Sequence, residues 1–160
     1  MINMPSPNFN DRPDGIEINS IIIHYTGMKT AQDALDRLCD PASEVSAHYT
    51  IDMDGIIYNH VDPHMRAWHA GKSKWNNLNN FNDFSIGIEL TNKGHEFGYH
   101  PFPDEQIDAL IELMKGLYKE FSINPKLVLG HSDIAPDRKQ DPGKYFPWDR
   151  LIEEKLAVRP

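Results

Sequence analysis

The eight histidines of this chain are its most chemically versatile residues, and two of them stand out by position. His24 directly follows three isoleucines, and His131 follows Val-Leu-Gly. A histidine at the mouth of a buried strand is held rigidly, as a metal ligand must be. Asp141 precedes a proline, which restricts its backbone to extended conformations and limits where its carboxylate can point. Two histidines and one carboxylate leave the fourth position of a tetrahedral Zn²⁺ open to water, which is the pattern of a catalytic site.

This triple does not by itself establish a metal site, because a histidine-rich chain offers several such combinations. His60 and His64 form a competing pair, whose spacing of four would place them on one face of a helix. Pro63 lies between them and breaks that geometry. His95 and His100 flank a predicted loop, where most histidines are simply solvated. Ordinary structural histidines therefore remain the alternative to a metal centre.

A glutamate and a lysine could complete a hydrolytic site. Glu89 stands between Ile88 and Leu90 in a strand-like run, where a carboxylate is either a salt-bridge partner or a general base. Lys139 stands two residues before Asp141. It could stabilise an oxyanion beside the metal, or it could be an ordinary surface cation. The pattern alone leaves both alternatives open.

Predicted strands position these residues. Residues 21–24 form a β-branched apolar run, which is typical of a strand buried on both faces. In residues 85–90 every second residue is apolar and shares one face, which leaves Glu89 on the other. Asp54-Gly55 separates two strand-like runs and is a strong hairpin signal. The predicted strands are 21–24, 47–51, 56–61, 85–90 and 128–129, the last of them ending in a loop that contains His131.

Predicted helices separate the strands. The clearest is 104–121, whose apolar residues form one stripe at helical spacing. Thr30 begins a capping-box pattern for a second helix over 30–39. A short final helix is predicted over 147–156, with Ile152 facing inward. Strands that interleave with helices, together with one hairpin, predict an α/β single domain in which a central mixed β-sheet is flanked by α-helices.

Length and composition limit the class of protein. A chain of 160 residues suits one domain, and we assign residues 20–160 to it and residues 1–19 to an N-terminal arm packed on it. The net charge of −8 argues against nucleic acid or an anionic membrane as a partner. No apolar run approaches the length of about 18 residues that a transmembrane helix needs.

The cysteine content and the N-terminus bear on location. The one cysteine, Cys39, excludes an internal disulfide, and we expect it to be structural. No secretory signal is visible at the N-terminus, which favours a cytoplasmic location. A periplasmic or cell-envelope location is the alternative if a signal was removed. The oligomeric state is not readable from the sequence.

Several segments of the chain resemble a known enzyme family. Ile-His-Tyr-Thr at 23–26, Ala-Trp-His-Ala-Gly at 67–71 and Ser-Ile-Gly-Ile-Glu-Leu at 85–90 are similar to the zinc amidases of the N-acetylmuramoyl-L-alanine amidase type 2 family. The long stretch 130–143, which contains Asp-Arg-Lys-Gln-Asp-Pro-Gly, matches as well. The opening 7–13 resembles the bacterial branch related to muropeptide-recycling and cell-wall amidases.

The resemblance implies a reaction and a set of residues. It implies one Zn²⁺ per chain, held by His24, His131 and Asp141. It places Glu89 and Lys139 at the reaction centre. The implied reaction is hydrolysis of the amide between N-acetylmuramic acid, or its 1,6-anhydro form, and L-alanine in peptidoglycan or muropeptides. Some relatives carry a cysteine at the third ligand position, where this chain has an aspartate.

The implied substrate also suggests which residues line the cleft. A stem peptide bears carboxylates, so cations beside the motif segments are candidate substrate-binding residues. Trp68 and His69 could line the sugar or peptide groove, because aromatic faces suit such surfaces. The candidate cations are Arg66, Arg138 and Lys72.

Two other functions fit the same residues. The first is a non-catalytic peptidoglycan-binding module of the same fold, against which the complete ligand set argues. The second is a zinc endopeptidase that cuts within the stem peptide. The products distinguish these functions from the amidase, because only the amidase releases the lactyl-muramic sugar and a peptide with a new N-terminal alanine.

Overall fold

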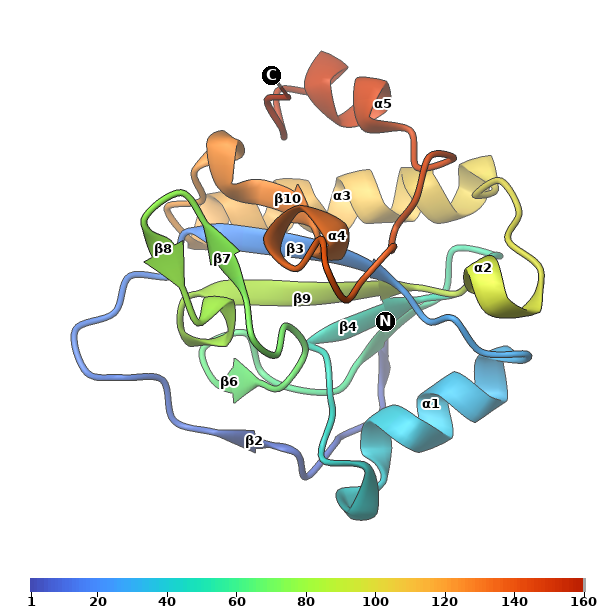
Figure 1. The fold of residues 1–160 in the computed structure, drawn as a ribbon, viewed down its shortest axis with the longest axis horizontal. Helices are drawn as coiled ribbons and strands as arrows, with labels where there is room; N and C mark the ends of the chain where they lie inside the picture. Colours follow the sequence, from blue (N-terminus) through green and yellow to red (C-terminus); the bar gives the residue numbers. More distant parts are fainter. Residues whose placement is uncertain (160) are drawn as a thin grey trace.

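A six-stranded mixed sheet organises the protein, whose computed structural model describes residues 1–159 (Figure 1). The strands lie in the order β1 (Ile2–Asn3), β5 (Ile57–Asn59), β4 (Tyr49–Ile51), β9 (Ser85–Leu90), β3 (Ser20–Tyr25) and β10 (Val128–Gly130). Parallel pairing joins β10 to β3, β3 to β9 and β9 to β4, whereas the β4–β5 hairpin is antiparallel. The predicted α/β fold with a central mixed sheet is confirmed.

The register of the central strands brings the chemical residues to one edge. His24 in β3 pairs with Glu89 in β9, and Gly130 at the end of β10 pairs with Ile23. The carboxyl ends of these three parallel strands therefore lie together. His24, Glu89 and the residue after Gly130 must meet at this edge, which is where open parallel sheets usually hold their ligands.

One face of the sheet is covered by the long helix α3 (Asp104–Glu120) and the short α5 (Trp148–Glu153). Ile21 and Ile23 of β3 point into this apolar layer, where Leu110 and Met114 of α3 are fully buried. In Figure 1, α3 runs behind the strands. Burying such a stripe of large aliphatic side chains contributes roughly 1.5–3 kcal/mol per residue and stabilises the sheet.

The opposite face is covered by loops and short elements. Ile22 of β3 packs there with Phe81 and with Ile134 of α4 (His131–Ile134). In Figure 1, α4 and the hairpin of β7 (Lys74–Trp75) and β8 (Leu78–Asn79) lie in front of the strands. A pocket opens near the edge that carries His24. The remaining elements are α1 (Ala31–Cys39), α2 (Gly94–Phe97), β2 (Phe9–Asn10), β6 (Arg66–Ala67), η1 (Pro41–Ser43), η2 (Phe81–Asp83) and η3 (Pro125–Leu127).

Residues 1–19 are tied to the domain at several points. β1 pairs in parallel with β5 at the edge of the central sheet, and β2 pairs with β6. The buried amide of Asn8 donates to the carbonyl oxygens of Asp40, at 2.9 Å, and Val45, at 2.8 Å. Across residues 1–159, the structure contains no helix that is both long and apolar enough to span a membrane.

Two local predictions were wrong. His131 was expected in a loop, but it begins the helical turn α4, because the carboxylate of Asp133 accepts the Gly130 N–H at 2.8 Å and caps that turn. Ile152 was expected to face inward, but it is 39% exposed, since α5 buries only Leu151 along its length.

Candidate active site

The three candidate metal ligands converge at the edge of the sheet. His24 comes from the end of β3, His131 begins α4, and Asp141 follows from the next loop. The Nδ1 atoms of the two histidines lie 3.0 Å apart, and each lies 3.2 Å from Oδ2 of Asp141. All three side chains are buried. Within the described part of the chain, they form a group that could hold a metal ion.

The donor set fits a metal such as Zn²⁺. Nε2 of His131 lies 2.9 Å from the carbonyl oxygen of Ala70, which can only accept a hydrogen bond. Nε2 of His131 therefore carries the proton, and the lone pair of Nδ1 points toward His24 and Asp141. Two imidazole nitrogens and a carboxylate oxygen are preferred Zn²⁺ ligands, and three of them form an open, catalytic type of site.

The protonation states suit ligation as well. Burial lowers the pKa of His24 to about 4, so its imidazole is neutral at pH 7. Burial alone would raise the pKa of Asp141, but the adjacent imidazoles of His131 and His24 hold it well below its usual range. A neutral histidine and an ionised carboxylate are the forms that bind a metal.

Glu89 stands next to this group. Its Oε1 lies 4.0 Å from Nδ1 of His24, and its side chain is 13% exposed. Oε2 has no hydrogen-bond partner among residues 1–159. Burial, and then the nearby charge of Asp141, raise the pKa of Glu89 well above its usual value, although Lys139 opposes the shift. A carboxylate with a raised pKa beside a candidate metal site is a candidate to take up and release a proton during a reaction.

A pocket of about 400 Å³ opens over these groups. Lys139 and Arg138 line it together with the candidate ligands and Glu89. Arg138 is held in place because its guanidinium donates to the carbonyl oxygen of Lys72 at 2.5 Å. The pocket therefore offers two cations beside a buried carboxylate cluster.

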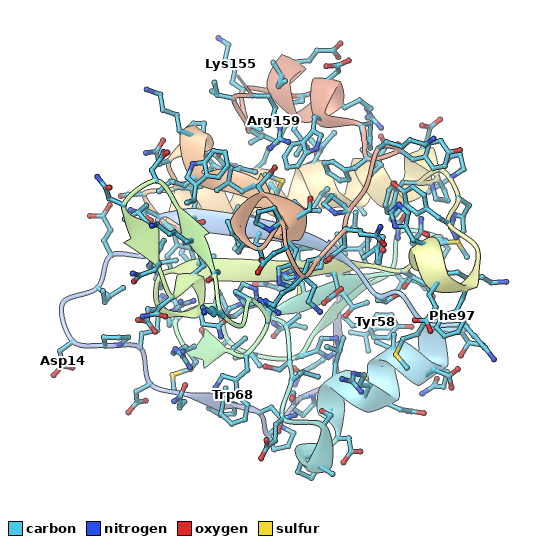
Figure 2. The ribbon with its side chains drawn as sticks, viewed as in Figure 1. Asp14, Tyr58, Trp68, Phe97, Lys155 and Arg159 are labelled. Carbon is cyan, nitrogen blue, oxygen red and sulfur yellow. The ribbon has the colours of Figure 1, made fainter. Side chains whose placement is uncertain are left out.

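The other candidate substrate-binding residues do not all line this pocket. Trp68 lines the pocket and donates from Nε1 to Oδ1 of Asn10 at 3.1 Å, and Figure 2 shows it beside β2. Arg66 is not among the lining residues, and its Nε donates to the Asp83 carboxylate at 2.8 Å. Lys72 lies on a neighbouring groove instead.

His69 reaches the pocket but is mostly covered. It is 8% exposed, and its Nδ1 lies 3.0 Å from Nε2 of His24. Burial lowers the pKa of His69 well below its usual value, so it is neutral. Its position beneath a candidate ligand, rather than in the wall of a groove, was not foreseen from the sequence.

Two residues at the rim of the pocket were not predicted from the sequence. The hydroxyl of Tyr25 lies 2.7 Å from Nδ1 of His95, and both residues line the pocket. Tyr25 directly follows His24, so its place at a strand end could have indicated it. His95 could not have been found by spacing, because its approach depends on the turn that carries α2.

The model of the N-acetylmuramoyl-L-alanine amidase family matches residues 14–144. This chain belongs to that family. The 1,6-anhydro-N-acetylmuramyl-L-alanine amidase AmpD of Haemophilus influenzae is 36% identical over 165 residues, which cover 92% of this chain and 88% of AmpD. The N-acetylmuramoyl-L-alanine amidase AmiD of Escherichia coli K12 is 38% identical over 155 residues, which cover 89% of this chain. The match covers only 55% of AmiD, so this amidase-family chain spans about half of that relative.

Solved amidase structures share the fold. A crystal structure of a selenomethionine derivative of AmpD matches with a TM-score of 0.84 and 31% identity, covering 98% of this chain and 94% of that one. A complex of AmiD from E. coli with the substrate anhydro-N-acetylmuramic acid-L-Ala-D-γ-Glu-L-Lys matches with a TM-score of 0.82 and 33% identity. It covers 96% of this chain and 68% of that one.

Proposed function

We propose that this chain is a Zn²⁺-dependent hydrolase that cleaves the amide between N-acetylmuramic acid, or its 1,6-anhydro form, and L-alanine in muropeptides. The observation that carries the proposal is the meeting of His24, His131 and Asp141 beside Glu89 at the base of one pocket. Family membership supports it, and the relatives named for the 1,6-anhydro substrate support that form of the sugar. The cytoplasmic location stays a prediction.

In this proposal Nδ1 of His24, Nδ1 of His131 and the Asp141 carboxylate hold the ion. When bound there, Zn²⁺ supplies the Lewis acidity that activates water and polarises a carbonyl. The hydrogen bond from His131 to Ala70 keeps one ligand in the required tautomer.

Glu89 is the proposed general base and acid. Its carboxylate accepts a proton as water attacks the amide carbon, and its raised pKa lets it return that proton to the departing L-alanine nitrogen. A base of normal carboxylate strength would hold the proton poorly at pH 7. The burial that raises the pKa of Glu89 therefore suits it to accept a proton and to return it.

Lys139 and Arg138 supply positive charge. We assign Lys139 to the oxygen that becomes negative in the tetrahedral intermediate, since one such stabiliser is typically worth about 10²–10³ in rate. Arg138 and the Trp68 surface would receive the stem peptide and the sugar. This local charge matters because the chain as a whole carries −8 and would otherwise repel an acidic substrate.

Digestion of soluble anhydro-muropeptides and of intact sacculi, with products identified by mass, tests the proposal. We expect a sugar that keeps its lactyl group and a peptide with a new N-terminal alanine. Cleavage between two amino acids would instead indicate the endopeptidase. Tight binding of muropeptide and metal without any release of peptide would indicate the non-catalytic module.

A further inference from the structure

One short loop contacts the outer nitrogen of both candidate histidine ligands. The carbonyl oxygen of Ala70 lies 2.9 Å from Nε2 of His131. Nδ1 of the neighbouring His69 lies 3.0 Å from Nε2 of His24. Two histidines from different elements, β3 and α4, are therefore oriented by consecutive residues of the same loop.

The hydrogen bonds beyond His69 fix the direction of its contact with His24. The hydroxyl of Ser85 donates its single proton to the carbonyl oxygen of Phe81. Ser85 Oγ must then accept from Nε2 of His69, which lies 3.2 Å away. Nε2 of the neutral His69 carries the proton, so its Nδ1 is bare and accepts from Nε2–H of His24. The lone pair of His24 Nδ1 is thereby directed at the other two ligands.

Asn82 holds the loop itself. Its side-chain Oδ1 accepts two backbone N–H groups, that of His69 at 3.0 Å and that of Ala70 at 2.8 Å. The side chain is buried, and the residue belongs to η2, which also supplies the Phe81 carbonyl. Across the sheet, a Cβ on Gly87 would stand 2.4 Å from Cγ of His69, so glycine leaves the space that the ring occupies.

We propose that His69 and Asn82 are positioning residues that preset the tautomer and orientation of His24 and His131 for one metal ion. His69 does so for His24 through its side chain, and Asn82 does so for both through the loop. This inference rests on the proposed metal site. Outer hydrogen bonds of this kind typically change metal affinity by about 10–100-fold.

Zn²⁺ affinity, measured by competition with a chelator on folded protein, tests the role of His69. We expect His69→Ala to weaken binding about 10–100-fold. His69→Asn should recover most of the loss, because its Oδ1 can accept from His24 much as the ring Nδ1 does. His60→Ala is the matched control, since His60 is also buried and bonded, to Met4 and Thr50, but away from the site.

The role of Asn82 is tested in the same way. Asn82→Ala should lower Zn²⁺ affinity, whereas Asn82→Asp, which keeps an acceptor at Oδ1, should retain more of it. Asn8→Ala is the control, because Asn8 also ties loops through its buried amide but far along the chain. If Asn82→Ala does not fold, the His69 pair decides the proposal.

A nitrogen-15 NMR spectrum of the Zn²⁺-loaded protein shows which ring nitrogen of His69 carries the proton. A merely structural role for His69 would not require one particular tautomer. We expect His69 as the Nε2–H tautomer with a bare Nδ1. A His69 proton on Nδ1, or equal affinity in His69→Ala and the unchanged protein, would overturn the inference. Failure of the unchanged protein to bind Zn²⁺ would instead refute the proposed function, so the two failures are distinguishable.

Discussion

The two faces of the central sheet are built from the same strands but are held in different ways. Toward α3, Ile21, Ile23 and Ile88 pack with aliphatic side chains and need no specific partner. Toward the pocket, the next residues along β3 and β9 are polar, namely the buried His24 and the partly buried Glu89. Burial of such groups is costly unless each is paired, so the polar face depends on individual hydrogen bonds. The apolar face should set stability, and the polar face should set metal binding and rate.

Glu89→Gln should give the largest functional effect on the polar face. An amide cannot accept the proton, and general-base catalysis is typically worth about 10²–10⁴ in rate. We expect turnover to fall by that factor while Zn²⁺ content, measured by metal analysis, stays unchanged. Glu96→Gln is the control, since Glu96 also lines the pocket and should keep activity within a few-fold. Comparable activity of the two variants would remove Glu89 from the role of base.

Lys139→Met should give the second-largest effect on turnover. Loss of one stabilising charge at the developing oxyanion should lower kcat by about 10²–10³ with a smaller change in KM. Steady-state kinetics on an anhydro-muropeptide measure this. Lys126→Met, a change in η3 beyond the pocket, should leave both constants as they are. A rise in KM with unchanged kcat would assign Lys139 to substrate binding alone.

Leu110→Ala tests whether the apolar face sets stability without affecting metal binding. Leu110 is fully buried under the sheet, so its truncation should lower the free energy of unfolding by about 2–5 kcal/mol. Zn²⁺ affinity of the folded variant should not change. Denaturant unfolding and chelator competition measure the two quantities, and Ile152→Ala, on the exposed side of α5, is the control. A large loss of metal affinity would mean that the two faces are not independent.

Acidification should reveal a pH-dependent effect on the polar face. Burial lowers the pKa of His48 to about 3 in the folded state, below the ordinary value of 6.5 that applies when the chain is unfolded. The unfolded state therefore binds the proton first. His48 should leave stability unaffected above pH 6.5 and lower it, by up to about 1.4 kcal/mol per pH unit, between pH 6.5 and 3.

The variant His48→Asn isolates that effect, because Oδ1 of asparagine can still accept the Gly87 N–H that Nδ1 accepts at 3.0 Å. Urea unfolding of metal-free protein at pH 7, 6 and 5 should show a shallower decline for the variant than for the unchanged protein. Parallel declines would show that His48 is not the titrating group.

Strand patterns made much of this arrangement predictable. The isoleucine run before His24 and the alternation around Glu89 depend on local sequence, and the parallel register then brings both to one edge. Contacts between loops were not predictable. His69 lies beneath His24, and Arg66 turns to Asp83 rather than into the pocket, because each position depends on segments distant along the chain. The edge strand β1 was not predicted, because a strand of two residues is too short to show an alternating pattern.

The central claim is that His24, His131 and Asp141 hold one Zn²⁺ that the amidase reaction requires. The most direct test is to strip the protein of metal with a chelator and to restore Zn²⁺ stepwise. The quantity followed is the peptide that is released with a new N-terminal alanine. We expect activity to disappear, to return in proportion to added Zn²⁺ and to level off at one ion per chain, with no recovery in His131→Ala. Full amidase activity in the stripped protein, or in folded His131→Ala, would contradict the account.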